Sequence, residues 1–154
     1  MPDEIEPYIP SGWVGRAETE LRRAGYHSTL PRSTITEAIG SKHCAITADE
    51  LSQELRRGGR PIGNATIYRT LELFEQLRLL RRLDFGDGVA RYEPMLPEGG
   101  HHHHHYVCSS CGTVTAFEDE AVEEAIEELS ERFGQRVEEH ELILRGTCSS
   151  CLDG

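Results

Sequence analysis

Two cysteine pairs constrain the fold of this 154-residue chain more than any other feature: Cys108-Ser-Ser-Cys111 and Cys148-Ser-Ser-Cys151. Two C-x2-C pairs are the usual way for a chain to supply four thiolates to a tetrahedral Zn²⁺. The alternatives are disulfides, a redox pair or coincidence. The chain begins with acidic residues where an export signal would be basic and then apolar, so we expect a compartment that keeps thiols reduced. The sequence therefore predicts a four-cysteine zinc site with a substructure between the pairs, and Cys44 as a buried or idle fifth thiol.

The charge of the chain is unevenly divided around a net value of −11. Residues 1–94 hold 13 basic and 14 acidic residues, whereas residues 95–154 hold 3 and 13. Twelve of the thirteen basic residues in the first segment are Arg, which suits phosphate and base-edge contacts. The total charge argues against indiscriminate nucleic-acid binding but leaves room for an Arg-bearing face on the first segment. No apolar run approaches the ~18 residues of a membrane span, so we expect a cytoplasmic protein with no membrane partner.

The first segment has the signals of four helices, predicted over residues 15–25, 31–40, 47–57 and 64–76. Thr47 and Glu50 form a capping box, in which each side chain covers an orphan backbone donor of the third helix. Asn64 is predicted to cap the fourth helix.

A hairpin is predicted after the fourth helix, because residues 79–84 and 89–93 flank a Gly-rich turn at 85–88. Several helices followed by a two-stranded hairpin describe a winged helix-turn-helix, whose recognition helix enters the major groove of DNA. The groove-facing side chains of that helix are predicted to be Asn64, Thr66, Tyr68 and Arg69. The alternative is a small helical domain whose Arg residues only solvate its surface.

Five consecutive histidines follow a Pro- and Gly-rich hinge predicted at residues 94–100. If residues 101–107 form a strand, successive side chains point to opposite faces. His103 and His105 then point one way with His101, and His102 and His104 point the other way. The tract can therefore supply two different metal sites.

The predicted helix 117–133 and strand 137–144 supply partners for one of these faces. Glu123 borders the apolar stripe of the helix, so its side chain can point toward the sheet. A histidine on a core-facing strand, such as His140, is more often structural than a ligand. The clustered histidines shift that balance toward a four-ligand N/O site made of His102, His104, Glu123 and His140.

Two other classes of protein use clustered histidines: metal storage or delivery proteins and zinc-dependent enzymes. The chain has no H-E-x-x-H helix and no obvious general base beside an open coordination position, so we do not expect an enzyme. Neither class needs a helix bearing Tyr68 and Arg69 followed by a wing. Metal-dependent binding to palindromic DNA would distinguish a regulator from both.

The chain resembles the ferric uptake regulator family. The resemblance covers residues 15–151 and rests on four features: Asn64-Ala-Thr-Ile-Tyr-Arg-Thr-Leu71, the Gly-rich wing, the histidines running into Tyr-Val-Cys-x-x-Cys-Gly, and the closing C-x2-C. The family implies an α+β fold, with a winged-helix DNA-binding domain at residues 1–93, including an arm at 1–14. The hinge and an α/β dimerisation domain at 101–154 follow. The family resemblance also implies a homodimeric repressor that binds double-stranded DNA operators when its regulatory metal is bound.

The resemblance assigns metal ligands residue by residue. The four paired cysteines match the structural zinc site, and His102, His104, Glu123 and His140 match a further site. The regulatory hinge site of the family draws on Glu93, His103 and His105. Two of its usual positions are replaced by Ala45 and Ala116, and His43 lies near the first.

These replacements bear on the sensed metal, because Fe²⁺ and Mn²⁺ prefer five or six N/O ligands whereas Zn²⁺ is content with four. The three hinge ligands plus one from the first domain, such as His43, would make a tetrahedral site. The sequence thus leans toward zinc, with iron or manganese as alternatives. The sequence also argues against a peroxide-sensing role, because the peroxide sensors of the family oxidise a histidine at the position that is Ala45 here.

Overall fold

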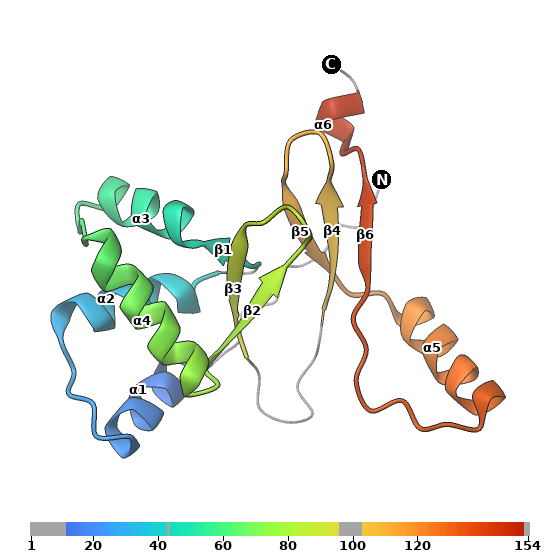
Figure 1. Cartoon of the computed structure of the whole chain (residues 1–154), viewed down its shortest axis with the longest axis horizontal. Helices are drawn as coiled ribbons and strands as arrows, with labels where there is room; N and C mark the ends of the chain where they lie inside the picture. The colour runs from blue at the N-terminus through green and yellow to red at the C-terminus, as the bar shows by residue number, and fades with distance from the viewer. Residues whose placement is uncertain (1–11, 43, 96–102, 153–154) are drawn as a thin grey trace. The chain divides into compact units, whose positions relative to one another are not determined.

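The computed structural model describes residues 12–42, 44–95 and 103–152, and the chain folds as two compact units (Figure 1). The N-terminal unit comprises α1 (Trp13–Arg23), α2 (Leu30–Gly40), β1 (Ile46–Thr47), α3 (Ala48–Arg57), α4 (Asn64–Gln76), β2 (Leu80–Asp84) and β3 (Ala90–Pro94). The C-terminal unit comprises β4 (His104–Cys108), β5 (Val114–Phe117), α5 (Glu120–Phe133), β6 (Ile143–Gly146) and α6 (Ser149–Leu152). No helix among the described residues is long and apolar enough to cross a membrane.

The N-terminal unit packs its helices over a small antiparallel sheet of order β1-β3-β2. Its core includes Ile35 of α2, Leu51 of α3 and Phe74 of α4, all fully buried. The indole N–H of Trp13 in α1 donates to the carbonyl oxygen of Leu79 across 2.9 Å, which fastens the first helix to the start of the hairpin. This arrangement is a winged helix-turn-helix, as the sequence predicted.

Of the two helix caps predicted in this unit, one is present in the structure and the other is not. The capping box of α3 is present: the Thr47 hydroxyl accepts from the backbone N–H of Glu50, and the Glu50 carboxylate accepts from that of Thr47. The prediction that Asn64 caps α4 is wrong, because the cap residue is Gly63 and makes no side-chain cap. The Asn64 side chain instead accepts a hydrogen bond from the Ser52 hydroxyl at 3.0 Å, which ties α4 to α3.

The C-terminal unit is built on a sheet of order β5-β4-β6, in which β4 pairs antiparallel with β5 and parallel with β6. Figure 1 shows most of α5 reaching away from this sheet, which its first turn contacts through Glu123. None of the α5 residues is buried, and Leu129 and Phe133 are 39% and 66% exposed. The C-terminal half of the apolar stripe predicted on this helix is therefore open to solvent in a single chain, whereas Val122 and Ile126 are half-buried.

Three predicted elements have boundaries that differ from the structure by two residues or more. The first helix begins two residues earlier than expected, at Trp13, and ends at Arg23. The helix predicted over 117–133 begins only at Glu120, because Phe117 is the last residue of β5 and the Asp119 carboxylate caps the helix by accepting from the backbone N–H of Val122. The last strand runs over 143–146 rather than 137–144, because its pairing with β4 starts only at Ile143. His140 therefore lies in the loop before β6.

Candidate metal centres and DNA-binding surface

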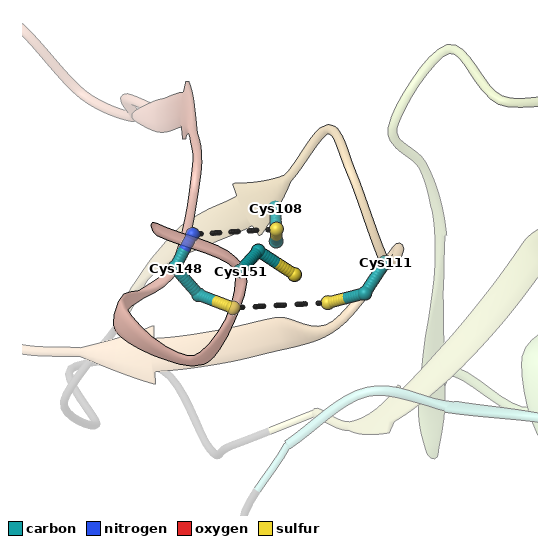
Figure 2. A group of neighbouring side chains, drawn as sticks. All are labelled: Cys108, Cys111, Cys148 and Cys151. Atoms are coloured by element: carbon teal, nitrogen blue, oxygen red, sulfur yellow. Dashed lines mark hydrogen bonds between the residues drawn. The ribbon is translucent and has the colours of Figure 1, made fainter. Parts of the chain in front are cut away.

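The four paired cysteines converge at one end of the C-terminal sheet (Figure 2). Their sulfur atoms all lie within 4.8 Å of one another, with Cys111 and Cys148 at 3.8 Å. A tight turn after β4 places the first pair. In this turn the backbone N–H of Gly112 donates to the carbonyl oxygen of Cys108 at 2.8 Å, and the φ of Gly112 is +75°. The α6 turn places the second pair.

The backbone prepares this cluster for a cation. The N–H of Cys148 donates to Sγ of Cys108 at 3.3 Å and, with further N–H groups, lowers the pKa of that thiol to about 6. The Thr113 hydroxyl, 3.1 Å from Sγ of Cys111, lowers the pKa of the Cys111 thiol. The neighbouring Cys148 and Cys111 raise the pKa of Cys151 to about 12, because adjacent sulfurs resist a further negative charge. Four soft sulfur donors in this arrangement match the preference of Zn²⁺.

A second cluster lies in the same unit, between β4, α5 and the loop before β6. Nε2 of His104 is 2.6 Å from Oε1 of Glu123, and Nε2 of His140 is 3.2 Å from Oε2 of Glu123. The two imidazole rings lie 5.4 Å apart, and His104 is almost wholly buried. The structure thus brings together three of the four residues expected at the further site, with ligand atoms within 4.8 Å. His102 lies outside the described residues.

The alternation expected along the histidine tract is present where the chain is described. The rings of His103 and His105 lie 5.1 Å apart, whereas His104 contacts Phe117 and His140. The strand therefore separates two sets of imidazoles, one of which belongs to the second cluster.

The remaining residues expected at the hinge site are placed as follows. Glu93 lies on β3 of the N-terminal unit, and its Oε1 accepts from Nε and Nη2 of Arg81 at 3.0 and 2.5 Å. His103 and His105 belong to the C-terminal unit. His43 lies outside the described residues.

The helix expected to read DNA presents two large polar side chains to solvent. Tyr68 is 45% exposed and Arg69 is also exposed, whereas Thr66 is half-buried. Asn64 is exposed as a residue but bonded to Ser52, so its amide positions the helix.

An ion pair joins two residues within the wing, the hairpin of β2 and β3 that follows α4. The Asp87 carboxylate accepts from both terminal nitrogens of Arg91, at 3.0 and 2.8 Å, and this contact lowers the pKa of Asp87 to about 2. The Arg91 guanidinium also stacks over Phe85 with its carbon 5.3 Å from the ring centroid.

Sequence reasoning missed three of these residues. Thr113 and Ser52 carry no pattern that marks them as partners of Cys111 and Asn64. Arg81 could have been found by aligning the two arms of the predicted hairpin, because it stands directly opposite Glu93 in the strand register.

A winged-helix unit followed by an α/β unit with a four-cysteine cluster and a His/Glu cluster defines a metal-responsive transcriptional regulator. The model of the ferric uptake regulator family matches residues 23–145, and the chain belongs to this family. It is 32% identical over 140 residues to the ferric uptake regulation protein of Bacillus subtilis, covering 90% of this chain and 93% of that protein.

Solved structures agree with this assignment. The ferric uptake regulator of Vibrio cholerae is 35% identical, with a TM-score of 0.71, and the match covers 85% of this chain and 98% of that chain. A ferric uptake regulator from Pseudomonas aeruginosa with manganese is 30% identical, with a TM-score of 0.65, and the match covers 86% and 98% of the two chains.

Proposed function

We propose that this chain is a homodimeric repressor that binds palindromic double-stranded DNA operators when its regulatory metal is bound. It would act in the cytoplasm on metal-uptake genes, with residues 94–100 as the hinge between a DNA-binding domain at 1–93 and a dimerisation domain at 101–154. The observation that carries this proposal is the presence of two chemically distinct ligand clusters in a chain that also bears a winged helix. A storage protein or a zinc-dependent enzyme would use the clusters but has no need for the exposed Tyr68 and Arg69.

The donor atoms of the two described clusters fit different roles. Cys108, Cys111, Cys148 and Cys151 would hold a structural Zn²⁺, whose binding free energy adds to folding. His104, Glu123 and His140, with His102, would hold a further metal with N/O donors, which suit zinc, iron and manganese alike.

We assign the regulatory site to Glu93, His103 and His105, with His43 as a fourth ligand. These residues come from both units, so they meet in only one arrangement of the units. We call the arrangement in which these residues meet the closed conformation, and it is favoured when the regulatory metal is bound. In a homodimer it would match the spacing of the two α4 helices, one from each chain, to the spacing of the operator half-sites. A switch from mostly open to mostly closed needs about 5 kcal/mol of differential affinity.

The number of available ligands supports Zn²⁺ as the regulatory metal. A tetrahedral set is expected where Ala45 and Ala116 replace two donors, and this favours Zn²⁺ over Fe²⁺ or Mn²⁺. Related solved structures are described with iron, with manganese and as zinc-bound, so the family accommodates all three.

The exposed face of α5 supports the homodimer. Leu129 and Phe133 on this helix, with Leu144 on β6, are large apolar side chains left open to solvent in one chain. Exposed apolar side chains on one unit are typical of an interaction surface, and a second copy of the chain would cover them.

The test is binding of the purified protein, treated with chelator under conditions that retain the cysteine-bound zinc, to DNA from upstream of its own gene. Fluorescence anisotropy would be followed at fixed salt while free Zn²⁺ or anaerobic Fe²⁺ is raised. Zinc should activate binding at far lower free concentration than iron, and His103→Ala should fold but lose the response. Activation by iron at its cellular levels would make the chain an iron regulator, and an unchanged response in His103→Ala would remove the hinge site.

A further inference from the structure

One basic side chain neutralises the carboxylate that the regulatory site needs. Arg81 on β2 stands opposite Glu93 on β3, and both Nε and Nη2 of its guanidinium donate to Oε1 of Glu93. The Glu93 side chain is 3% exposed, whereas that of Arg81 is 34% exposed. The buried partner is thus the carboxylate, and the partner that reaches solvent is the cation.

This asymmetry has an energetic consequence. A buried carboxylate without a positive partner is strongly unfavourable, so Arg81 stabilises Glu93 in the metal-free chain. A metal cation and a guanidinium on the same carboxylate repel each other, and they would share Oε1 if the metal binds both oxygens. A metal ion that binds both oxygens of Glu93 must displace the half-exposed Arg81 side chain toward solvent, and one that binds through Oε2 alone must bear the repulsion of the nearby guanidinium.

We propose that Arg81 sets the metal concentration at which this regulator responds, by competing with the regulatory metal for Glu93. The inference rests on the proposed assignment of Glu93 to the regulatory site. The competition lowers the metal affinity of the site below the value that its ligands alone would give. The metal concentration at which the protein responds then depends on a side chain that is not itself a metal ligand.

The hairpin offers a matched control for this proposal. Arg82 is the next residue on β2, carries the same charge and is exposed, and its register partner is Tyr92 rather than Glu93. Arg81→Gln and Arg82→Gln therefore change the net charge of the same strand equally. Only the first removes a guanidinium that bonds Glu93.

The experiment measures the affinity of the full chain, with its cysteine-bound zinc retained, for Zn²⁺ at the regulatory site. The metal is titrated against a chromophoric chelator in the absence of DNA, and the midpoint of DNA binding is then measured as a second readout. Arg81→Gln should bind the metal about tenfold more tightly and lower the midpoint of DNA binding by the same factor, since a charged hydrogen bond is lost from the metal-free state only. Arg82→Gln should stay within about twofold of the parent chain.

Equal affinities in Arg81→Gln and Arg82→Gln, or weaker binding in Arg81→Gln, would overturn the competition. Glu93→Gln separates this failure from failure of the proposed site. Weakened metal binding in Glu93→Gln with no gain in Arg81→Gln would refute only the role of Arg81, whereas no effect in Glu93→Gln would refute both. If Arg81→Gln does not fold, Arg81→Lys takes its place, because it keeps the charge but loses the two-nitrogen contact. It should bind the metal about threefold more tightly, and unchanged affinity would overturn the proposal.

Discussion

Nε2 of His104 lies 2.6 Å from Oε1 of Glu123, so a buried strand residue and a carboxylate in the first turn of α5 share one contact. The other oxygen of Glu123 lies 3.2 Å from Nε2 of His140, in the loop before β6. Glu123 therefore stands between two imidazoles that come from different parts of the unit. A carboxylate in this position can hold the two rings together in the metal-free chain and bind a cation with them.

Replacing Glu123 tests this second cluster. Glu123→Ala should lose about one equivalent of metal per chain while retaining the cysteine-bound zinc, because the two ligand clusters share no residue. Elemental analysis after dialysis against a weak chelator would measure both. Glu127→Ala, which removes the same charge from the next turn of α5, should keep full metal content. Full occupancy in Glu123→Ala would exclude Glu123 as a ligand.

Replacing a zinc-ligand cysteine should have a larger effect on stability. Cys108→Ser leaves three thiols, and we expect the loss of zinc and of several kcal/mol of folding free energy from the C-terminal unit. Chemical denaturation and zinc analysis would measure this loss. Cys44→Ser is the matched control, since Cys44 lies in the other unit, and it should retain zinc and stability. Retention of zinc in Cys108→Ser would show that the metal is held elsewhere.

Much of the N-terminal unit could be predicted because its signals are local. The capping box at Thr47 and Glu50 and the Gly-rich turn of the hairpin each depend on a few neighbouring residues. The alternation of the histidines is equally local, because it needs only the period of a strand.

The features that could not be predicted depend on partners far away in the sequence. Residues 114–117 become a strand because they pair with β4, and the strand before the last cysteines starts where that pairing starts, at Ile143. Asn64 has the side chain of a helix cap, but Ser52 offers it a hydrogen bond twelve residues away. Such contacts override local propensity and leave no mark in the order of residues.

The exposed side chains of α4 should carry the DNA affinity. Arg69→Ala is expected to weaken binding to the operator by about 5- to 150-fold, because a base contact by Arg contributes roughly 1–3 kcal/mol. Tyr68→Ala should also weaken binding, and neither change should alter the fold, since both side chains reach solvent. Fluorescence anisotropy at fixed salt and saturating metal would measure this. Arg132→Ala in α5 changes the charge equally and should bind normally, and equal losses in Arg69→Ala and Arg132→Ala would mean that only net charge matters.

The ion pair at the wing predicts a specific pH dependence. Contact with Arg91 lowers the pKa of Asp87 from 3.8 to about 2. A carboxyl group whose pKa is lower in the folded than in the unfolded chain contributes stability that is fully present above the unfolded value. That contribution is lost only as the pH falls toward the folded value. Asp87→Asn should therefore lower the melting temperature by an amount that stays constant from pH 8 to pH 5.

Thermal unfolding of the zinc-loaded chain and of Asp87→Asn over this range provides the measurement. Both chains carry the same cysteine site at every pH, including the values below pH 5, so loss of zinc affects them equally and the difference between them reports on the wing. Below about pH 4 the two melting temperatures should converge, because protons then bind Asp87 in the unfolded chain before they bind it in the folded chain, and so favour unfolding. A difference that already shrinks between pH 8 and pH 5 would show that the Asp87 carboxylate is not held in its charged form by Arg91.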